Sequence, residues 1–593
     1  MALLALVTAL GIGLCLHYGR IGYLPLDQSI VFDGAWRMFR SGQLPYRDYF
    51  TPSSLLPIVM QLVFFRVLGV SWFSYCLHAA LMNGAFAALS FWLLRRWGCG
   101  RLPALAFAAF SAVVMYPPVG VPYGDQHSLF FVSVTVALTT AAIQTRNVAL
   151  AKAFWASVPL AALAAILSKQ NPGLLTLPLL VLGPLLAPPK ERVRGLLWCS
   201  LGALFGLALL ALLAFSLSIK GELAWYFFWE LPRGTARGRL LADHLPEFSN
   251  RTGKLYSALV AMGGLLLLFV AGLRGAPNSI GSRSRSVLFA FALALLVLLA
   301  AAMAHDVGST RILVRLSAAA CTLFFLTMLA AAVWTWRSNS PLSESLAMVA
   351  SQRLPVLVLA LGLVLIDYLF SLLTNNDAEN CCAHVFVASG ALYATLAAEG
   401  SGRYLKRAAS AVLLLALFDT TVFNLRTNAG RRVNDFRGPL HVVPGATIDP
   451  MLSFMLYDAP KLEGYPHVEA ADYRALLEFL RSHQGNFFLL GDSSILYALS
   501  NRPSLNPTLW YHPGLAMPLV GTPMFDWYQA QILSAIRDNH CRFLVVEDTH
   551  TWTHVQLADF PALERELNPD PSTHEHFGVF EVIPFKASRA PAQ

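Results

Sequence analysis

Residues 196–217 have the sequence LLWCSLGALFGLALLALLAFSL, which contains no charged side chain. A helix needs about 20 apolar residues to cross the roughly 30 Å hydrocarbon core of a bilayer. This run follows the basic cluster Lys190-Glu191-Arg192-Val193-Arg194, and Lys and Arg in short loops mark the cytoplasmic side. The run is therefore predicted to be a transmembrane helix whose first residues are cytoplasmic.

The same pattern recurs along most of the chain. On the length criterion we predict about thirteen spans, centred near residues 10, 82, 110, 136, 158, 180, 206, 264, 295, 322, 363, 391 and 416. Basic clusters lie in alternate loops, which predicts a cytoplasmic N-terminus and an external C-terminal segment. The first run has no basic region before it and no small-residue cleavage site, so we predict an uncleaved span rather than a signal peptide.

The composition excludes a soluble enzyme. Of the 593 residues, 56% are hydrophobic and 13% charged, whereas a soluble domain has about 25% charged residues. The net charge of +9 is spread over short loops, while a nucleic-acid-binding protein concentrates it on one face. We expect membrane lipid, and no nucleic acid, among the partners.

From about Arg426 onwards the composition becomes polar. We predict a transmembrane domain over 1–425 and an extracytoplasmic α/β domain over 426–593. Strands at 486–490, 542–547 and 577–584, with helices at 473–483, 494–499 and 526–539, indicate a small parallel sheet. The turn Gly491-Asp492-Ser493 lies where such a sheet binds ligands, or is an N-capped strand-to-helix turn. The fold class is mainly α.

Acidic residues gather in the predicted external loops. Asp27 and Asp125 each stand beside a span on the same face of the membrane. Two such carboxylates could hold a divalent cation, Mg²⁺ or Mn²⁺, or one could act as a general base. Alternatively each caps the helix that follows it. His127 could be a ligand or could hold Asp125 in place. Residues 30–40 and 55–68 suit interfacial helices.

Residues 27–52, DQSIVFDGAWRMFRSGQLPYRDYFTP, resemble the first external loop of the membrane-embedded GT-C glycosyltransferases. The resemblance is to the branch with protein mannosyltransferases and the bacterial lipid A aminoarabinose transferase. The segment Ser168-Lys169-Gln170-Asn171-Pro172-Gly173 is similar to a Lys-Gln turn of bacterial members. The chain departs from the pattern at Gln28, where Glu is usual, which leaves Asp48 or Asp33 as a replacement.

The resemblance implies transfer of a sugar from a polyprenyl-phosphate donor to a lipid, glycan or protein acceptor. The reaction would take place at the outer face of a bacterial inner or plasma membrane. Asp27 carries over as the catalytic base, and Asp125 as the acid that positions a metal or the substrate. The further residues expected to meet the substrates, several of which can instead reach the interface as snorkelling side chains, are Asp48, Arg47, His127, Lys169, Arg233, Arg237 and Arg239.

A transporter or flippase of lipid-linked or glycan substrates is the alternative. It would need ionisable groups or broken helices near the middle of the membrane.

The predicted orientation can be tested with reporter fusions. A reporter joined after residue 190 should give a cytoplasmic signal, and one joined after residue 500 an external signal. The reason is that the alternation of basic loops sets the side of the membrane on which each loop lies. A cytoplasmic signal at residue 500 would reverse the assigned topology.

Overall fold

The computed structural model describes residues 1–234, most of 355–370, 383–397, 403–428, 441–459, 468–547 and 555–586 without 569. The predicted spans near residues 264, 295 and 322 lie outside these residues. So do Arg237 and Arg239.

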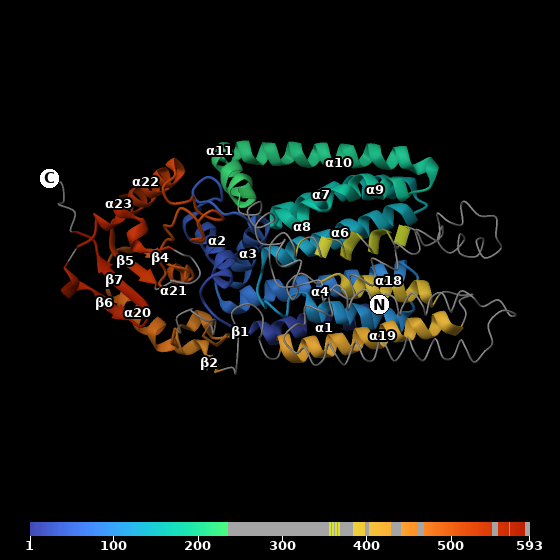
Figure 1. Cartoon of the computed structure of the whole chain (residues 1–593), viewed down its shortest axis with the longest axis horizontal. Coiled ribbons are helices and arrows are strands. Elements are labelled where there is room, and N and C mark those ends of the chain that lie inside the picture. The colour runs from blue at the N-terminus through green and yellow to red at the C-terminus, as the bar shows by residue number, and fades with distance from the viewer. Residues whose placement is uncertain are drawn as a thin grey trace, which may run out of the picture.

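Apolar helices occupy nine of the other ten predicted span positions, and the described residues around the tenth, near residue 363, are helical (Figure 1). Within the described residues, five helices are long and apolar enough to cross a membrane: α1 (Ala2–Gly19), α4 (Trp72–Arg96), α6 (Gly124–Gln144), α7 (Val148–Ser168) and α10 (Pro189–Ser216). Shorter or more polar helices are α5 (Arg101–Val114), α9 (Leu177–Leu186), α18 (Val385–Leu396) and α19 (Arg403–Phe423). The chain is therefore a multi-pass membrane protein.

Shorter helices lie between the bundle and the C-terminal segment (Figure 1). They are α2 (Asp27–Ser41), α3 (Leu55–Leu68), α8 (Gln170–Leu174), α11 (Gly221–Trp225) and the π-helical turn η1 (Tyr226–Glu230). The two helices predicted near 30–40 and 55–68 are α2 and α3. The turn from α9 to α10 lies at the other end of the bundle (Figure 1).

The C-terminal segment contains a four-stranded sheet in the order β4-β5-β7-β6. Its strands are β4 (Asn486–Leu490), β5 (Cys541–Glu547), β6 (Glu575–Phe577) and β7 (Phe580–Pro584). The strands β4 and β5 are parallel, as predicted. The expectation of a wholly parallel sheet is wrong, because β7 runs antiparallel to both β5 and β6. The two residues between β6 and β7, with Gly578 at φ 58°, are too few for a crossover connection.

The described α-helices of this segment are α20 (Ala470–Ser482), α21 (Leu496–Leu499), α22 (Pro523–Asp538) and the short α23 (Pro561–Glu564). A second, three-stranded sheet joins the segment to the beginning of the chain. In it β1 (Ile21–Gly22) pairs parallel with β3 (Leu456–Tyr457), and β3 pairs antiparallel with β2 (Val443–Pro444). The strand β1, which follows α1, is thereby fixed to the C-terminal segment.

A buried ion pair fixes α2 to the C-terminal segment. Arg37 Nε donates to Asp33 Oδ2 at 2.9 Å, and Arg37 Nη1 donates to the Asn506 carbonyl at 2.6 Å. Ser504 Oγ donates to the other oxygen of Asp33. Both charged side chains are almost fully buried, with exposures of 1% and 0%. Position 33 was a candidate second acid of the site, and its carboxylate is instead used in this joint.

Substituting Arg37 tests how strongly this joint stabilises the fold. Arg37→Ala leaves Asp33 as an unpaired buried charge, which should cost about 3–5 kcal/mol and lower the melting temperature in detergent markedly. Arg47→Ala is the matched control, because its partner Asp48 is half-exposed and surface pairs contribute about 1 kcal/mol or less. Equal melting temperatures for the two variants would contradict this account.

Candidate functional site

Asp27 begins α2 next to a strained backbone position. Leu26 has φ 56° and ψ −136°, and a non-glycine residue adopts such a conformation only where its surroundings hold it. The Leu26 amide donates to the Asp492 carbonyl of the C-terminal segment at 3.1 Å. On the other side, the Tyr123 hydroxyl donates to Asp27 Oδ2 at 2.6 Å. The carboxylate is therefore oriented from both the helix bundle and the C-terminal segment.

Lys169 lies at a break between α7 and α8. Its backbone is extended, with φ −157° and ψ 134°, so it ends one helix and begins the next. The Ser168 carbonyl, which the break frees, accepts the Ser54 amide at 2.8 Å. Ser128 Oγ lies within hydrogen-bond distance of the Ala165 and Lys169 carbonyls on either side of the break, at 2.9 and 3.2 Å. Irregular backbone at membrane depth is tolerated only where it is satisfied in this way.

The beginning of α6 approaches this break because residue 124 is glycine. A Cβ added at Gly124 would lie 2.6 Å from Ser54 Oγ and 3.0 Å from the Ser168 carbonyl oxygen. Asp125 is the next residue. Its carboxylate forms an ion pair with the Lys169 ammonium.

The Asp125–Lys169 pair is buried on one side and open on the other. Asp125 has a side-chain exposure of 1%, whereas that of Lys169 is 22%. The Lys169 ammonium also lies 5.9 Å from the centre of the Tyr123 ring. Tyr123 is the residue whose hydroxyl donates to Asp27. The solvent-facing member of the pair is thus a cation.

The charges of this cluster act on Asp27. Burial raises the pKa of the Asp27 carboxyl, the hydrogen bond from Tyr123 and the charge of Lys169 lower it, and the charge of Asp125 raises it. The net effect is a raised pKa. The structure therefore brings Asp27, Asp125 and Lys169 together, three residues that the sequence analysis selected. It adds Tyr123, whose signal was its position directly before Gly124-Asp125.

His127 lies behind this cluster. Its ring is fully buried, and Nδ1 is 2.9 Å from the Tyr123 carbonyl and 3.0 Å from the Tyr116 hydroxyl. A carbonyl only accepts, so Nδ1 donates to Tyr123. Nε2 is 3.0 Å from Nε2 of His78. His127 thus fixes the backbone of Tyr123, and its hydrogen-bond partners are Tyr123, Tyr116 and His78 rather than the Asp125 carboxylate it was expected to hold.

Two other predicted residues pair with each other. The Arg47 guanidinium donates to Asp48, with Nη2 2.7 Å from Oδ2, and the Leu44 amide donates to the same oxygen at 2.7 Å. This arrangement closes the turn 44–48, so Asp48 does not replace the acid missing at Gln28. Arg233 is exposed beyond η1.

The donor set beside Asp27 does not suit a divalent cation. Mg²⁺ takes six oxygen ligands, but Asp125 is neutralised here by the Lys169 ammonium, which would repel a second cation. Among the described residues there is also no group of three His, Cys, Asp or Glu side chains that could hold a metal ion.

The turn Gly491-Asp492-Ser493 binds a side chain of the protein itself. The amides of Asp492 and Ser493 both donate to Glu547 Oε2 at 2.8 Å, and Ser493 Oγ donates to Oε1 at 2.8 Å. A Cβ at Gly491 would lie 2.4 Å from the Cβ of Glu547. The turn is thus a structural strand-to-helix connection, but the expected N-cap is not formed, because no side chain caps α21.

No family model and no curated protein matches the chain. It is similar to two solved structures of ArnT from Cupriavidus metallidurans, one bound to undecaprenyl phosphate and one in the apo state. Both are 15% identical, cover 99% of this chain and 99% of their own, and have TM-scores of 0.40 and 0.41. The Archaeoglobus fulgidus oligosaccharyltransferase in complex with Zn and sulfate is 11% identical, with 98% and 72% coverage and a TM-score of 0.38. Both proteins are GT-C superfamily members, the superfamily that the first external loop resembles.

Proposed function

We propose that this chain is an integral-membrane glycosyltransferase of GT-C type. It transfers a sugar from a polyprenyl-phosphate donor to a hydroxyl group of an acceptor at the outer face of the membrane. The observation that carries this proposal is the cluster of Asp27, Tyr123, Asp125 and Lys169, in which a partly exposed carboxylate stands beside a partly exposed ammonium.

The two charged groups suit the two halves of a glycosyl transfer. Asp27 accepts the proton of the acceptor hydroxyl as its oxygen attacks the anomeric carbon. The bond between that carbon and the phosphate oxygen breaks, and the electron pair leaves with the polyprenyl phosphate. Lys169 stabilises the charge of the departing phosphate. A single displacement of this kind inverts the anomeric centre.

Asp125 has a supporting role in this scheme. It is buried and holds Lys169 in an extended backbone position at the helix break. The partly exposed ammonium is therefore held in position for a donor phosphate. Tyr123 holds the Asp27 carboxylate by its 2.6 Å hydrogen bond, so the base is oriented before the substrates bind.

One buried pair corresponds to what the transporter alternative requires. Asp367 Oδ1 lies 2.6 Å from His384 Nδ1 inside the bundle. The other ring nitrogen is 2.8 Å from Ser133 Oγ and 3.0 Å from the Leu129 carbonyl. One nitrogen of the His384 ring is thus held by Asp367 and the other by residues of α6. A ring held from both sides suits a fixed contact between helices better than a site that carries a substrate.

The proposal is tested by incubating the purified protein with a panel of polyprenyl-phosphate sugars and measuring release of the lipid phosphate. Asp27→Asn should lower turnover by about 100-fold or more, because a positioned general base contributes at least that factor. Asp526→Asn, at an exposed acid in the first turn of α22, is the matched control and should keep wild-type turnover. Full turnover of folded Asp27→Asn would remove Asp27 from the mechanism.

The pH dependence gives a second test. The base works as a carboxylate, so the rate falls as the pH falls through the pKa of Asp27. Burial raises that pKa, and the Tyr123 hydrogen bond lowers it. Tyr123→Phe should therefore shift the acidic limb of the rate profile to higher pH, while Tyr226→Phe in η1 should leave it in place. A limb that stays or moves to lower pH in Tyr123→Phe would contradict this role.

A further inference from the structure

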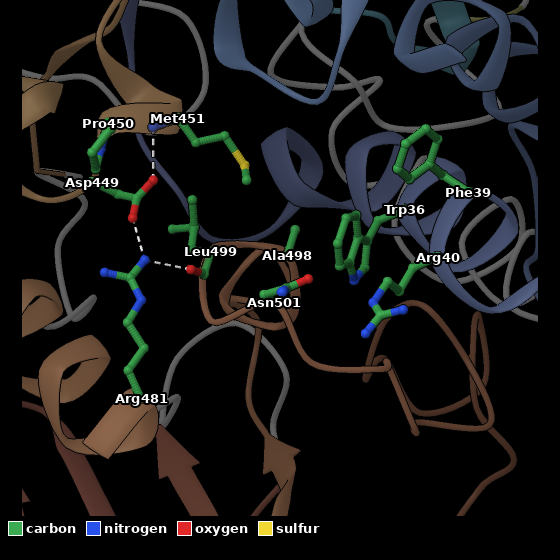
Figure 2. Close-up of a pocket in the computed structure, with 10 residues that line it drawn as sticks. All are labelled: Trp36, Phe39, Arg40, Asp449, Pro450, Met451, Arg481, Ala498, Leu499 and Asn501. Atoms are coloured by element: carbon green, nitrogen blue, oxygen red, sulfur yellow. Dashed lines mark hydrogen bonds and ion pairs between the residues drawn. The ribbon is translucent and has the colours of Figure 1, made fainter. Parts of the chain in front are cut away.

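A solvent-open groove of about 810 Å³ lies between α2 and the C-terminal segment (Figure 2). One wall consists of Trp36, Phe39 and Arg40 on consecutive turns of α2. The other wall comes from residues 449–451, from Arg481 in the last turn of α20, and from 498–501 around α21. The volume of the groove is in the range of pockets that hold small organic ligands, about 300–1,000 Å³.

The middle of the groove is lined by the half-buried Phe39 and Met451, over Trp36 and Leu499, which are 4% and 2% exposed. The Trp36 indole nitrogen donates to the Arg502 carbonyl at 2.9 Å, which holds the ring in place. Phe39 stacks near it, with ring centres 6.1 Å apart and planes inclined by 24°. Leu499 and Met451 extend this surface towards the far wall (Figure 2).

The two ends of the groove carry cations. Arg40 is exposed at the α2 end. At the other end Arg481 has a side-chain exposure of 42%, whereas Asp449, its ion-pair partner, has 6%. Arg481 uses Nη2 for Asp449 and for the Leu499 carbonyl, and its guanidinium has five N–H donors in all. The accessible charge of the groove is therefore positive at both ends, with Asp449 largely covered.

We propose that this groove binds an acidic oligosaccharide, as the part of the acceptor remote from the reacting hydroxyl. The inference rests on the proposed function. The apolar face of a sugar ring packs on Phe39, which the buried Trp36 supports from behind. The carboxylate or phosphate substituents pair with Arg40 and Arg481. A neutral glycan would use the apolar surface alone and would form no ion pair with the exposed guanidinium groups of Arg40 and Arg481.

The position of the groove along α2 supports this assignment. Asp27 begins the helix, and Trp36 and Arg40 follow nine and thirteen residues later. At 1.5 Å per residue these distances are about 14 and 20 Å along the helix axis. A saccharide of a few rings can span such a distance, so one rigid helix carries both the base and the surface that holds the rest of the acceptor.

The test measures binding by calorimetry to the full chain in phosphatidylcholine nanodiscs. The probes are trigalacturonate and the neutral maltotriose. Trigalacturonate should bind, maltotriose should bind at least about tenfold more weakly, and Arg40→Gln should weaken trigalacturonate binding by about tenfold or more, because hydrogen bonds between charged groups are the strong ones. Phe39→Ala should weaken it as well. Arg474→Gln, at an exposed arginine of α20, is the control and should bind as the wild type does.

Three results would overturn the proposal. The first is the absence of trigalacturonate binding to the wild type. The second is equal weakening by Arg40→Gln and Arg474→Gln, which would indicate attraction to a basic surface in general. The third is displacement of the sugar by anionic lipid in phosphatidylglycerol nanodiscs, which would assign the groove to lipid headgroups. Binding should persist in Asp27→Asn, so a failure of the groove and a failure of the transferase proposal are distinguishable.

Discussion

The constraint on which the site depends is that charges placed at the end of an apolar bundle must be neutralised. Removing an ion from water costs several kcal/mol unless a partner compensates it. Lys169 and Asp125 meet this requirement as a pair, and the break between α7 and α8 exists where Lys169 must turn towards Asp125. Asp27 lies within the field of both residues and receives its own hydrogen bond from Tyr123. The position of each polar group at this end of the bundle is therefore determined by the others.

The C-terminal segment completes this arrangement from the opposite side. Glu547 at the end of β5 fixes the amides of Asp492 and Ser493, and the Asp492 carbonyl then accepts the amide of Leu26. The strained backbone before Asp27 is thus held by a strand more than five hundred residues later in the chain. Strain of this kind persists only where tertiary contacts over-determine the conformation. The sheet consequently contributes to the geometry of the base without contributing a side chain to it.

Features with a local cause were predictable from sequence. A membrane span is defined by the length of an apolar run, and the alternation of basic loops placed Asp27, Asp125 and Lys169 on one face. Contacts that depend on tertiary pairing were not predictable. Tyr123 was not selected from the sequence, and Asp33 looked like a spare acid although the i, i+4 spacing to Arg37 was visible. The antiparallel β7 and the occupation of the 491–493 turn by Glu547 depend on strand order, which no single segment encodes.

The glutamine at position 28, where the resembling loops have glutamate, is consistent with the same charge balance. Gln28 is buried, with 3% exposure, and its Nε2 donates to the Val119 carbonyl at 3.3 Å. A glutamate there would place a carboxylate against a carbonyl oxygen, so two acceptors would face each other without a proton. It would also add a second negative charge beside Asp27 in a cluster where Lys169 already neutralises Asp125. With Asp33 and Asp48 each paired to an arginine, the amide at position 28 leaves Asp27 as the carboxylate available to take a proton at this end of the described bundle.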